Sequence, residues 1–469
     1  MTAVPALKRG IRFRDLVLFY IVSGLSARWT ATAAAAGPSI LIIWVAALLF
    51  FFVPLAASVM ELSSRLPEEG GLYVWTREAF GDASAFIAAW TYWMSNLPYF
   101  SGVLYFGAAS CLFAFGSRGR SLVSSPAYYV AFSLVWLAFI TVLNIRGVNF
   151  GKWLNNISSL GSIIPLSALL ILAALTYARF GSATHFSVAS LIPHWSLDNA
   201  IFWSSVFFAF GGVESGSAMG DEIENPRRNI PLAILLGGSV LAVGYISGTF
   251  ALLIAAPSAA VSGPDGFING IRLLSDRLGL GWLVAAIALF LGLNAIGGAA
   301  SYLSSTSRLP FVAGIDHYLP AAFGRIHPRY RTPWIAIGVY GLAGMIVAVL
   351  SQAGATVRNA YEVLVSMGFI AYFIPYLFVF GAMIRLQSRP APPEARRVPG
   401  GKPVAILLGT IGILSTTATI LLSAIPAGDE PNKPLTVLKV IGGAALMVGS
   451  GAAVFALERS RRNRNQRQN

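Results

Sequence analysis

The chain has 469 residues, of which 56% are hydrophobic and only 11% are charged. A soluble globular domain carries about 25% charged residues, so most of this surface does not face water, and lipid is its natural solvent. The formal net charge is +14. The basic residues are scattered among loops rather than gathered on a soluble face, which argues against a nucleic-acid partner.

Metal and disulfide chemistry have little support in the sequence. The single cysteine, Cys111, excludes an intrachain disulfide and a cysteine-based metal site. The four histidines (His185, His194, His317 and His327) lie outside the apolar runs, and we interpret them as solvated loop residues. The basic N-terminus has no apolar core followed by a cleavage site, so we do not expect a signal peptide. We predict no metal and no cofactor.

Apolar runs of about 20 residues, the length that crosses the hydrocarbon core as a helix, recur along the chain. Charged residues, proline and glycine bound these runs. We therefore predict an all-α polytopic membrane protein. The twelve predicted transmembrane helices cover residues 15–36, 40–61, 82–111, 126–145, 153–178, 198–221, 230–256, 280–307, 333–351, 359–385, 403–424 and 434–457.

The distribution of lysine and arginine orients these spans. An even number of spans puts both termini on one side of the membrane. The loops and tails on that side carry 24 of the 33 basic residues, and the opposite loops carry 8. Because basic residues concentrate in cytoplasmic loops, we predict a multi-pass protein of the cell inner membrane. Residues 1–14 form a cytoplasmic N-terminal tail and residues 458–469 a basic cytoplasmic tail.

Two of the spans carry glycine and hydroxyl residues near mid-membrane depth. One segment is Ser23-Gly24-Leu25-Ser26, and the other is Gly211-Gly212-Val213-Glu214-Ser215. Glycine weakens a helix by about 1 kcal/mol relative to alanine. A broken helix is tolerated in a membrane only where it lines a cavity or the protein interior, and its exposed N–H groups attract anions such as carboxylates. Close helix packing by small residues is the alternative interpretation.

The positions of these segments favour the first interpretation. They lie in the first and sixth spans, and the first ten spans divide into residues 15–178 and residues 198–385. Since five is odd, the second repeat must be inverted in the membrane. Interrupted segments at corresponding positions of two such repeats mark a transporter's binding site. Residues 403–457 then form two peripheral helices.

Two charges and two amides lie in the apolar spans. A charge at membrane depth is costly and indicates function by default. Glu214 could titrate, bind a cationic group or pair with Arg28, and Arg28 could attract a substrate carboxylate. A purely structural pair between them stays open. Asn96 and Asn294 could join neighbouring helices or contact substrate.

Three segments resemble the signatures of the amino acid–polyamine–organocation transporter superfamily. Residues 207–234 read FFAFGGVESGSAMGDEIENPRRNIPLAI and resemble its F-x-G-x-E core followed by N-P-[RK]-[RK]-x-[IV]-P. Residues 66–81, LPEEGGLYVWTREAFG, resemble its P-x-x-G-G-x-Y segment. Residues 305–320, STSRLPFVAGIDHYLP, resemble its loop after the eighth span. The three motifs occur in the family's order across most of the chain.

This resemblance implies a LeuT-like five-plus-five inverted-repeat fold and amino acids or related amines as substrates. By position, residues 23–26 would hold the substrate carboxylate. Phe208, Gly211 and Gly212 would meet its amino group, and Phe208 would act as a gate. Glu214 matches a glutamate of acid-resistance exchangers in the family. The candidate substrate-binding residues are Ser23, Gly24, Leu25, Ser26, Arg28, Asn96, Phe208, Gly211, Gly212, Glu214, Ser215 and Asn294.

The chain departs from the family pattern at two places. The usual G-[ST]-G-I-F break reads Ser23-Gly24-Leu25-Ser26-Ala27 here, with Arg28 following. Some members carry a lysine in the fifth span that replaces a sodium ion or shuttles a proton, and Ser162 aligns with it. This departure favours an exchanger or facilitator. The candidate coupling residues are Glu214 and Ser162.

We therefore predict a secondary transporter of amino acids or related amines that works by alternating access, with an exchanger favoured. A proton-coupled symporter is the alternative. An intramembrane enzyme would need a converging nucleophile and base or a metal cluster, a channel would need rings of carbonyls or charges, and neither pattern is evident. A solute-independent sensor with the same fold is a further remote alternative. The expected partners are a small-molecule substrate and the lipid bilayer, and a homodimer is left open.

Overall fold

The computed structural model describes residues 7–116, 119, 121–261, 265–351, 357–426 and 432–468. All regular elements in these ranges are helical, apart from one isolated bridge between Ile11 and Ile223. Of the predicted tails, residues 1–6 and 469 lie outside the described residues.

In the described residues, the first five predicted spans are built from nine α-helices, one π-helix and one 3-10 helix, several of them joined end to end. The amphipathic helix α5 (Leu72–Phe80) lies between the second and third spans. In chain order the spans are α1 (Phe13–Gly24) with α2 (Ala27–Ala34); α3 (Ile40–Ala47) with the π-helical η1 (Leu48–Phe52) and α4 (Val53–Arg65); α6 (Asp82–Ser95) with α7 (Leu97–Leu112) and η2 (Phe113–Phe115); α9 (Pro126–Arg146); and α10 (Val148–Ser158) with α11 (Leu160–Phe180).

The remaining spans follow the same order as predicted. They are α13 (Leu197–Phe208) with η3 (Ser215–Glu222), α14 (Pro226–Ala255), α16 (Leu283–Thr306) with α17 (Arg308–Ile315), α18 (Trp334–Leu350), α19 (Val357–Leu386), α20 (Gly401–Ser423) and α21 (Lys433–Gln468). The short connecting helices are α12 (Val188–Leu191), η4 (Ser258–Val261), α15 (Gly266–Arg277) and η5 (Ala321–Gly324).

Length and hydropathy alone identify eight or nine of the twelve predicted spans in the described residues. Eight helical stretches in the described residues are long and apolar enough to cross a membrane, and α1 with α2 forms a ninth that bends by 40°. Two shorter apolar helices, Trp334–Leu350 and Ile370–Leu386, match the ninth and tenth predicted spans. The segment from α13 to η3 lies at the position of the sixth predicted span and is not among these stretches. The described part of the chain therefore accounts for every predicted span.

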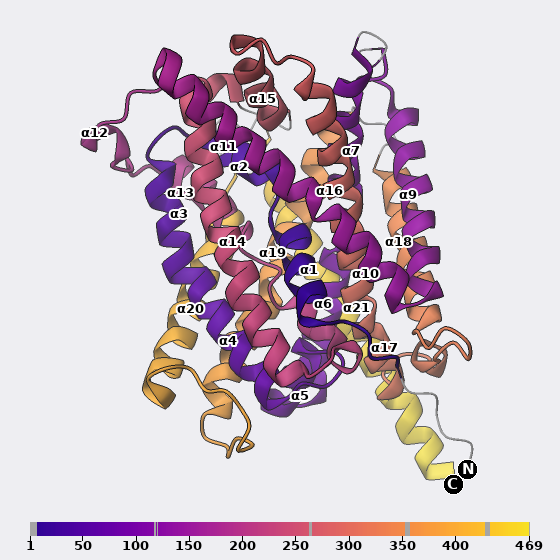
Figure 1. Cartoon of the computed structure of the whole chain (residues 1–469). Coiled ribbons are helices and arrows are strands. Elements are labelled where there is room, and N and C mark those ends of the chain that lie inside the picture. The colour runs from indigo at the N-terminus through magenta and orange to yellow at the C-terminus, as the bar shows by residue number, and fades with distance from the viewer. Residues whose placement is uncertain are drawn as a thin grey trace.

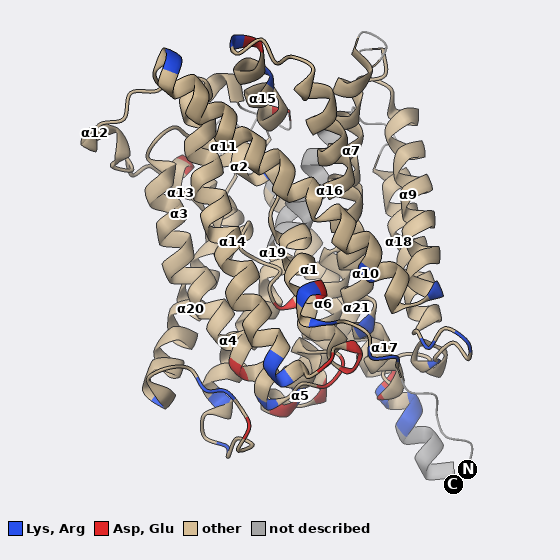
Figure 2. Ribbon diagram, viewed as in Figure 1, with Lys and Arg blue, Asp and Glu red and all other residues tan. Residues whose placement is uncertain are grey.

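The helices form one bundle with its charges at the two ends. Both termini lie at the end that carries α5 and α17, and α12 and α15 lie at the other end (Figure 1). Lysine, arginine and acidic residues gather at these ends, and the helix mid-sections are largely free of them (Figure 2). Around the middle, large apolar side chains such as Phe50 and Leu414 are exposed. This surface suits the hydrocarbon core of a bilayer.

Candidate functional site

The first span breaks between Gly24 and Ala27. Leu25 and Ser26 adopt extended backbone conformations, so they interrupt the helical hydrogen bonds between α1 and α2. The buried hydroxyl of Tyr245, on α14, donates to the Gly24 carbonyl and accepts from the Ser26 N–H at 3.3 Å. Tyr245 is itself stacked on Trp44, with ring centroids 4.7 Å apart. One side chain from another helix thus provides hydrogen-bond partners for two of the backbone groups at the break.

The sixth span breaks after Phe208. Turns replace the α-helix between Phe208 and η3, and Gly212 has a φ of +109°, which favours glycine. The Gly212 N–H donates to Glu214 Oε2 and to the Tyr376 hydroxyl, both at 3.1 Å. The Ser215 hydroxyl donates to the Gly212 carbonyl at 2.5 Å. The two helices therefore break where the sequence predicts.

The Glu214 carboxylate is buried behind this break. Its Oε1 atom accepts from the hydroxyl of Tyr92, on α6, at 2.6 Å and from the hydroxyl of Tyr376, on α19, at 2.9 Å. Among the described residues no ion pair joins Glu214 to Arg28. The carboxylate instead ties the third, sixth and tenth spans together through tyrosine hydroxyls.

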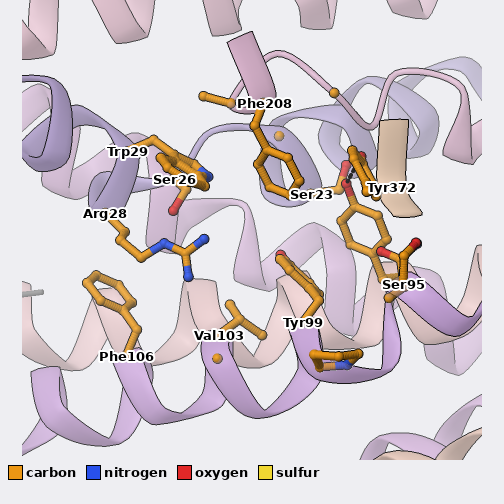
Figure 3. A pocket seen from close by; sticks show the side chains of 17 residues that line it. Ser23, Ser26, Arg28, Trp29, Ser95, Tyr99, Val103, Phe106, Phe208 and Tyr372 are labelled. Carbon is orange, nitrogen blue, oxygen red and sulfur yellow. Dashed lines mark hydrogen bonds between the residues drawn. The ribbon is translucent and has the colours of Figure 1, made fainter. Parts of the chain in front are cut away.

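A cavity lies between the two breaks (Figure 3). The walls combine backbone of both breaks, hydroxyl groups and aromatic rings from α1, α2, α6, α7, α13, α16 and α19. Its lining residues are Ser23, Gly24, Ser26, Arg28, Trp29, Ser95, Asn96, Pro98, Tyr99, Gly102, Val103, Phe106, Phe208, Ala209, Gly211, Tyr302 and Tyr372.

Aromatic rings close one side of the cavity. The ring of Phe208 lies 5.4 Å from that of Trp29 and 4.7 Å from that of Tyr372, measured between centroids. The guanidinium carbon of Arg28 lies 4.7 Å from the Trp29 ring centroid. Arg28 is only 8% exposed, although it carries a full charge. The arrangement offers a cationic group, hydroxyls and ring faces to one bound molecule.

The structure divides the predicted site residues into three groups. Seven line the cavity: Ser23, Gly24, Ser26, Arg28, Asn96, Phe208 and Gly211. Three do not line the cavity and form hydrogen bonds with one another at the sixth-span break. The Gly212 N–H donates to the Glu214 carboxylate, and the Ser215 hydroxyl donates to the Gly212 carbonyl. Leu25 and Asn294 line a separate small cavity together with Ser162.

In that small cavity, Asn294 on α16 donates its amide N–H to Ser162 Oγ, on α11, at 2.6 Å. It lies 3.5 Å from the carbonyl oxygen of Val22 at the end of α1. Neutral hydrogen bonds thus join three spans at this place. Asn96 bonds mainly within its own helix, since its amide N–H donates to the Tyr92 carbonyl at 2.7 Å.

The sequence analysis did not single out several aromatic residues of the site. Asn96, Tyr99, Val103 and Phe106 recur at helical spacing and therefore share one face of α7, which is the face that lines the cavity. This spacing in the sequence could have identified these residues as members of one helix face at the site. Tyr372, which lines the cavity, and Tyr376, which bonds Glu214, are likewise four residues apart on α19.

Backbone and charged groups close the bundle between the cavity and the end that carries the termini. The N–H groups of Gly10 and Ile11 donate to the Glu222 carbonyl at 2.9 and 3.0 Å. Arg308 on α17 donates to both carboxylate oxygens of Glu222 at 2.8 Å. Glu69 Oε1 lies 3.6 Å from the Arg308 Nε atom. All three of these charged side chains are buried.

A sequence pattern described as amino acid permease matches residues 14–446. The chain belongs to the amino acid permease family. The prediction of an amino acid transporter is thereby confirmed at the level of the family. Within the described residues, no group of three or more His, Cys, Asp or Glu side chains lies close enough to hold a metal ion.

Similar proteins cover most of the chain. A probable agmatine/putrescine antiporter of Lactococcus lactis is 24% identical over 91% of this chain and 90% of its own length. A glutamate/gamma-aminobutyrate antiporter of the same species is 25% identical over 81% of this chain and 76% of its own length. The crystal structure of MhsT in complex with L-phenylalanine superposes with a TM-score of 0.63 over 89% of this permease and 99% of MhsT, at 15% identity. This likeness confirms the LeuT-like fold.

Proposed function

We propose that the permease exchanges amino acids or related amines across the membrane and binds them in the cavity between the two helix breaks. One observation carries the proposal: two helices, in the first and sixth spans, break at the same cavity, and a tyrosine from another span forms hydrogen bonds with the backbone at each break. Broken helices that face one cavity at mid-membrane depth are the pattern of a transport site.

The groups around the cavity suit an amino acid. Ser23 and Ser26 offer hydroxyls beside the start of α2, and the first N–H groups of a helix have no partner within it. Such a helix start favours a carboxylate. On the other side, Phe208 and Tyr372 present ring faces, which attract an ammonium group. Movement of Phe208 away from Trp29 would open this side.

Exchange needs a coupling step that does not depend on a driving ion. Asn294 and Ser162 join α16, α11 and the end of α1 through neutral hydrogen bonds. These contacts support a transport cycle in which substrate itself drives the change of state. Glu214 is the remaining coupling candidate, because its protonation would change the hydrogen bonds to Tyr92 and Tyr376.

We further assign residues 15–178 and 198–385 to two inverted repeats and residues 403–457 to peripheral helices. We place both termini in the cytoplasm of a bacterial-type cell inner membrane. The excess of lysine and arginine at the end that carries the termini supports this orientation (Figure 2). On this orientation, the contacts between Arg308 and Glu222 would form a gate on the cytoplasmic side of the cavity.

Uptake by purified protein in liposomes tests the proposal. Amino acids and amines are offered as radiolabelled substrates, with and without unlabelled substrate inside and with imposed proton or sodium gradients. We expect uptake that requires internal substrate. Uptake into empty liposomes that follows the proton gradient would indicate the alternative, a proton-coupled symporter, and absence of uptake for every compound would contradict the transport proposal.

The role of Glu214 is tested in the same assay with Glu214→Gln. The amide keeps the shape of the side chain but cannot titrate. If Glu214 couples a proton to transport, this variant loses the dependence of exchange on pH. Unchanged exchange and an unchanged pH profile would remove Glu214 from the mechanism.

A further inference from the structure

We infer that the permease binds an anionic phospholipid, with an acyl chain in an apolar cavity between α6 and α17 and the headgroup phosphate beside the arginines at the end of α21. This inference goes beyond the proposed function and does not depend on it. It rests on two neighbouring features, the cavity and a basic helix end.

The cavity lies between the third and eighth spans, apart from the site between the two helix breaks. Its lining is apolar or aromatic throughout and includes Phe86, Ala89 and Trp90 of α6, Leu309 and Ala313 of α17, and Phe323 of η5. At a rise of about 1.5 Å per residue, Phe86 and Trp90 lie about 6 and 12 Å along α6 from its charged first residue, Asp82. The cavity is therefore at the depth of the outer hydrocarbon, and its apolar walls suit an acyl chain better than a water-soluble ligand.

The helix α21 supplies cationic groups at the same end of the bundle. It has 36 residues and is about 54 Å long, whereas the hydrocarbon core is about 30 Å thick. Its C-terminal turns extend past the other helices at the end that carries the termini (Figure 1). Residues 459–467 contain five arginines and no acidic residue. Basic clusters that directly follow a transmembrane helix attract anionic lipid headgroups.

Aromatic contacts place this helix end beside the cavity. The ring of Phe455, on α21, lies 5.6 Å from that of Phe86 and 4.8 Å from that of Tyr318, measured between centroids. Two turns further along α21, the guanidinium carbon of Arg462 lies 5.9 Å from the Tyr318 ring centroid. Tyr318 precedes Leu319, which lines the cavity. A lipid whose acyl chain fills the cavity can therefore place its phosphate at the level of the arginines.

Two acidic residues lie near these arginines but are outnumbered by them. Glu458 pairs with Arg461 at 2.7 Å, and both side chains lie at the surface, where water weakens such a pair. Asp82 accepts a hydrogen bond from the Tyr318 hydroxyl at 2.6 Å. Five arginines against two carboxylates leave this end cationic. A phosphate group compensates that charge through charge-assisted hydrogen bonds.

Lipid binding to the purified full-length protein in detergent tests this inference. The probe is phosphatidylglycerol, and phosphatidylcholine with the same acyl chains is the reference. Native mass spectrometry counts bound lipid, and thermal unfolding reports stabilisation. We expect phosphatidylglycerol to bind at least about tenfold more tightly and to raise the melting temperature further. The preference should shrink in 1 M salt, where the Debye length is about 3 Å. Inorganic phosphate, which has no acyl chain, should not compete.

One pair of variants tests the headgroup contact. Three arginines of the helix end are replaced together, by Arg459→Gln, Arg461→Gln and Arg462→Gln. We expect the affinity for phosphatidylglycerol to fall at least about tenfold. The matched control removes three exposed basic residues between α19 and the first turn of α20, by Arg396→Gln, Arg397→Gln and Lys402→Gln. This control should bind phosphatidylglycerol as the natural protein does.

A second pair of variants tests the acyl-chain cavity. Ala89→Leu places a larger side chain in the cavity and should weaken the binding of phosphatidylglycerol. Ala138→Leu makes the same change at an exposed position of α9 and should not. Thermal unfolding checks that each variant folds. Because the comparison of the two lipids uses the natural sequence, it stands even if Ala89→Leu fails to fold.

Equal affinities for the two lipids, or an equal loss of affinity in the two triple variants, would overturn the inference. So would competition by inorganic phosphate, or normal lipid binding by a folded Ala89→Leu. A dimer that Ala89→Leu disrupts would show that a second copy of the chain covers the cavity, which also contradicts the inference. None of these measurements involves transport, so their failure leaves the proposed function standing.

Discussion

Tyr245 satisfies two backbone groups that the break after α1 leaves without helical partners. Its hydroxyl donates to the Gly24 carbonyl and accepts from the Ser26 N–H. In hydrocarbon there is no water to take over this role. The position of the break therefore depends on a residue of α14 as well as on the sequence of the first span.

Replacement of Tyr245 by phenylalanine should destabilise the break specifically. We expect Tyr245→Phe to lower the free energy of unfolding by about 2 kcal/mol, because two buried backbone groups lose their partner. It should also weaken substrate binding, since both groups border the cavity. Thermal unfolding in detergent and a binding titration measure the two effects.

Tyr340→Phe is the matched control for this change. The hydroxyl of Tyr340 is also in a buried side chain, and it donates to the Trp93 carbonyl at 3.2 Å, away from the cavity lining. This variant should lose stability but bind substrate normally. Equal binding defects in both variants would show that Tyr245 has only a general role in packing.

Glu69, outside the membrane spans, gives the proposed cytoplasmic gate a dependence on pH. Burial, and secondly the nearby carboxylate of Glu222, raise its pKa well above the usual value, while Arg308 and the backbone N–H of Asp221 oppose this shift. A raised pKa means that the folded state binds the proton more tightly than the unfolded state. The contribution of Glu69 to stability is therefore present at low pH and is lost as pH rises above about 4.3, the ordinary glutamate value, through the raised value.

We accordingly expect Glu69→Gln to flatten the pH dependence of thermal unfolding. The natural protein should lose stability as pH rises, and the amide variant should lose less, because it has no proton to release. Glu68→Gln, which alters the exposed neighbouring side chain, is the control and should follow the natural protein. A Glu69→Gln curve parallel to that of the natural protein would contradict this account.

Part of the site could be predicted from single residues, and part could not. Glycine, serine and charge within apolar runs identified Ser23, Arg28 and Gly211, because such residues are conspicuous in a membrane span. Tyr92 and Tyr376 were missed because tyrosine is ordinary in such spans. Their role depends on the packing of the third and tenth spans against Glu214, which one sequence does not specify.

At the scale of elements, the break in the sixth span depends on Gly212. Its φ of +109° is accessible to glycine and strained for other residues. A Cβ at this position would also collide with the hydroxyl of Tyr302 on α16. The glycine thus allows the turn and the close approach of another helix at the same place.

Gly212→Ala should therefore impair transport. Strained backbone of this kind costs about 1–3 kcal/mol, and the displaced Tyr302 lines the cavity. We expect exchange in liposomes to fall by at least about tenfold, which corresponds to 1.4 kcal/mol in an equilibrium.

Gly37→Ala is the control for backbone strain alone. Gly37 also has a positive φ, of +81°, but no atom lies within 4 Å of the position of a Cβ. This variant should lose some stability and keep its exchange activity. If both variants exchange normally, the conformation at Gly212 does not matter for transport.

The long apolar spans could be predicted from composition, because a run of about 20 apolar residues is typical of a transmembrane helix. The joints inside them were harder to predict. The span predicted over 82–111 is divided at Asn96 into α6 and α7, and the span predicted over 153–178 begins earlier, in α10 at Val148. Helix joints depend on contacts with neighbouring helices as much as on local sequence.

At the scale of the whole molecule, the orientation can be tested by labelling. After Cys111→Ser removes the single cysteine, new cysteines are introduced one at a time at two exposed serines. Ser187 precedes α12, at the end away from the termini, and Ser388 lies between α19 and α20. We expect a membrane-impermeant maleimide to label Ser187→Cys in intact cells and Ser388→Cys only after lysis. The opposite pattern would invert the proposed topology.

The central claim is that substrate binds in the cavity between the two breaks, and a variant that fills this cavity tests it most directly. Val103 lines the cavity and is 9% exposed, whereas Val135 on α9 is 65% exposed at the outside of the bundle. Binding of radiolabelled substrate to purified Val103→Trp and Val135→Trp is the measurement, with thermal unfolding as the check on folding. We predict that Val103→Trp folds but loses binding while Val135→Trp binds normally. Normal binding by a folded Val103→Trp would contradict the account.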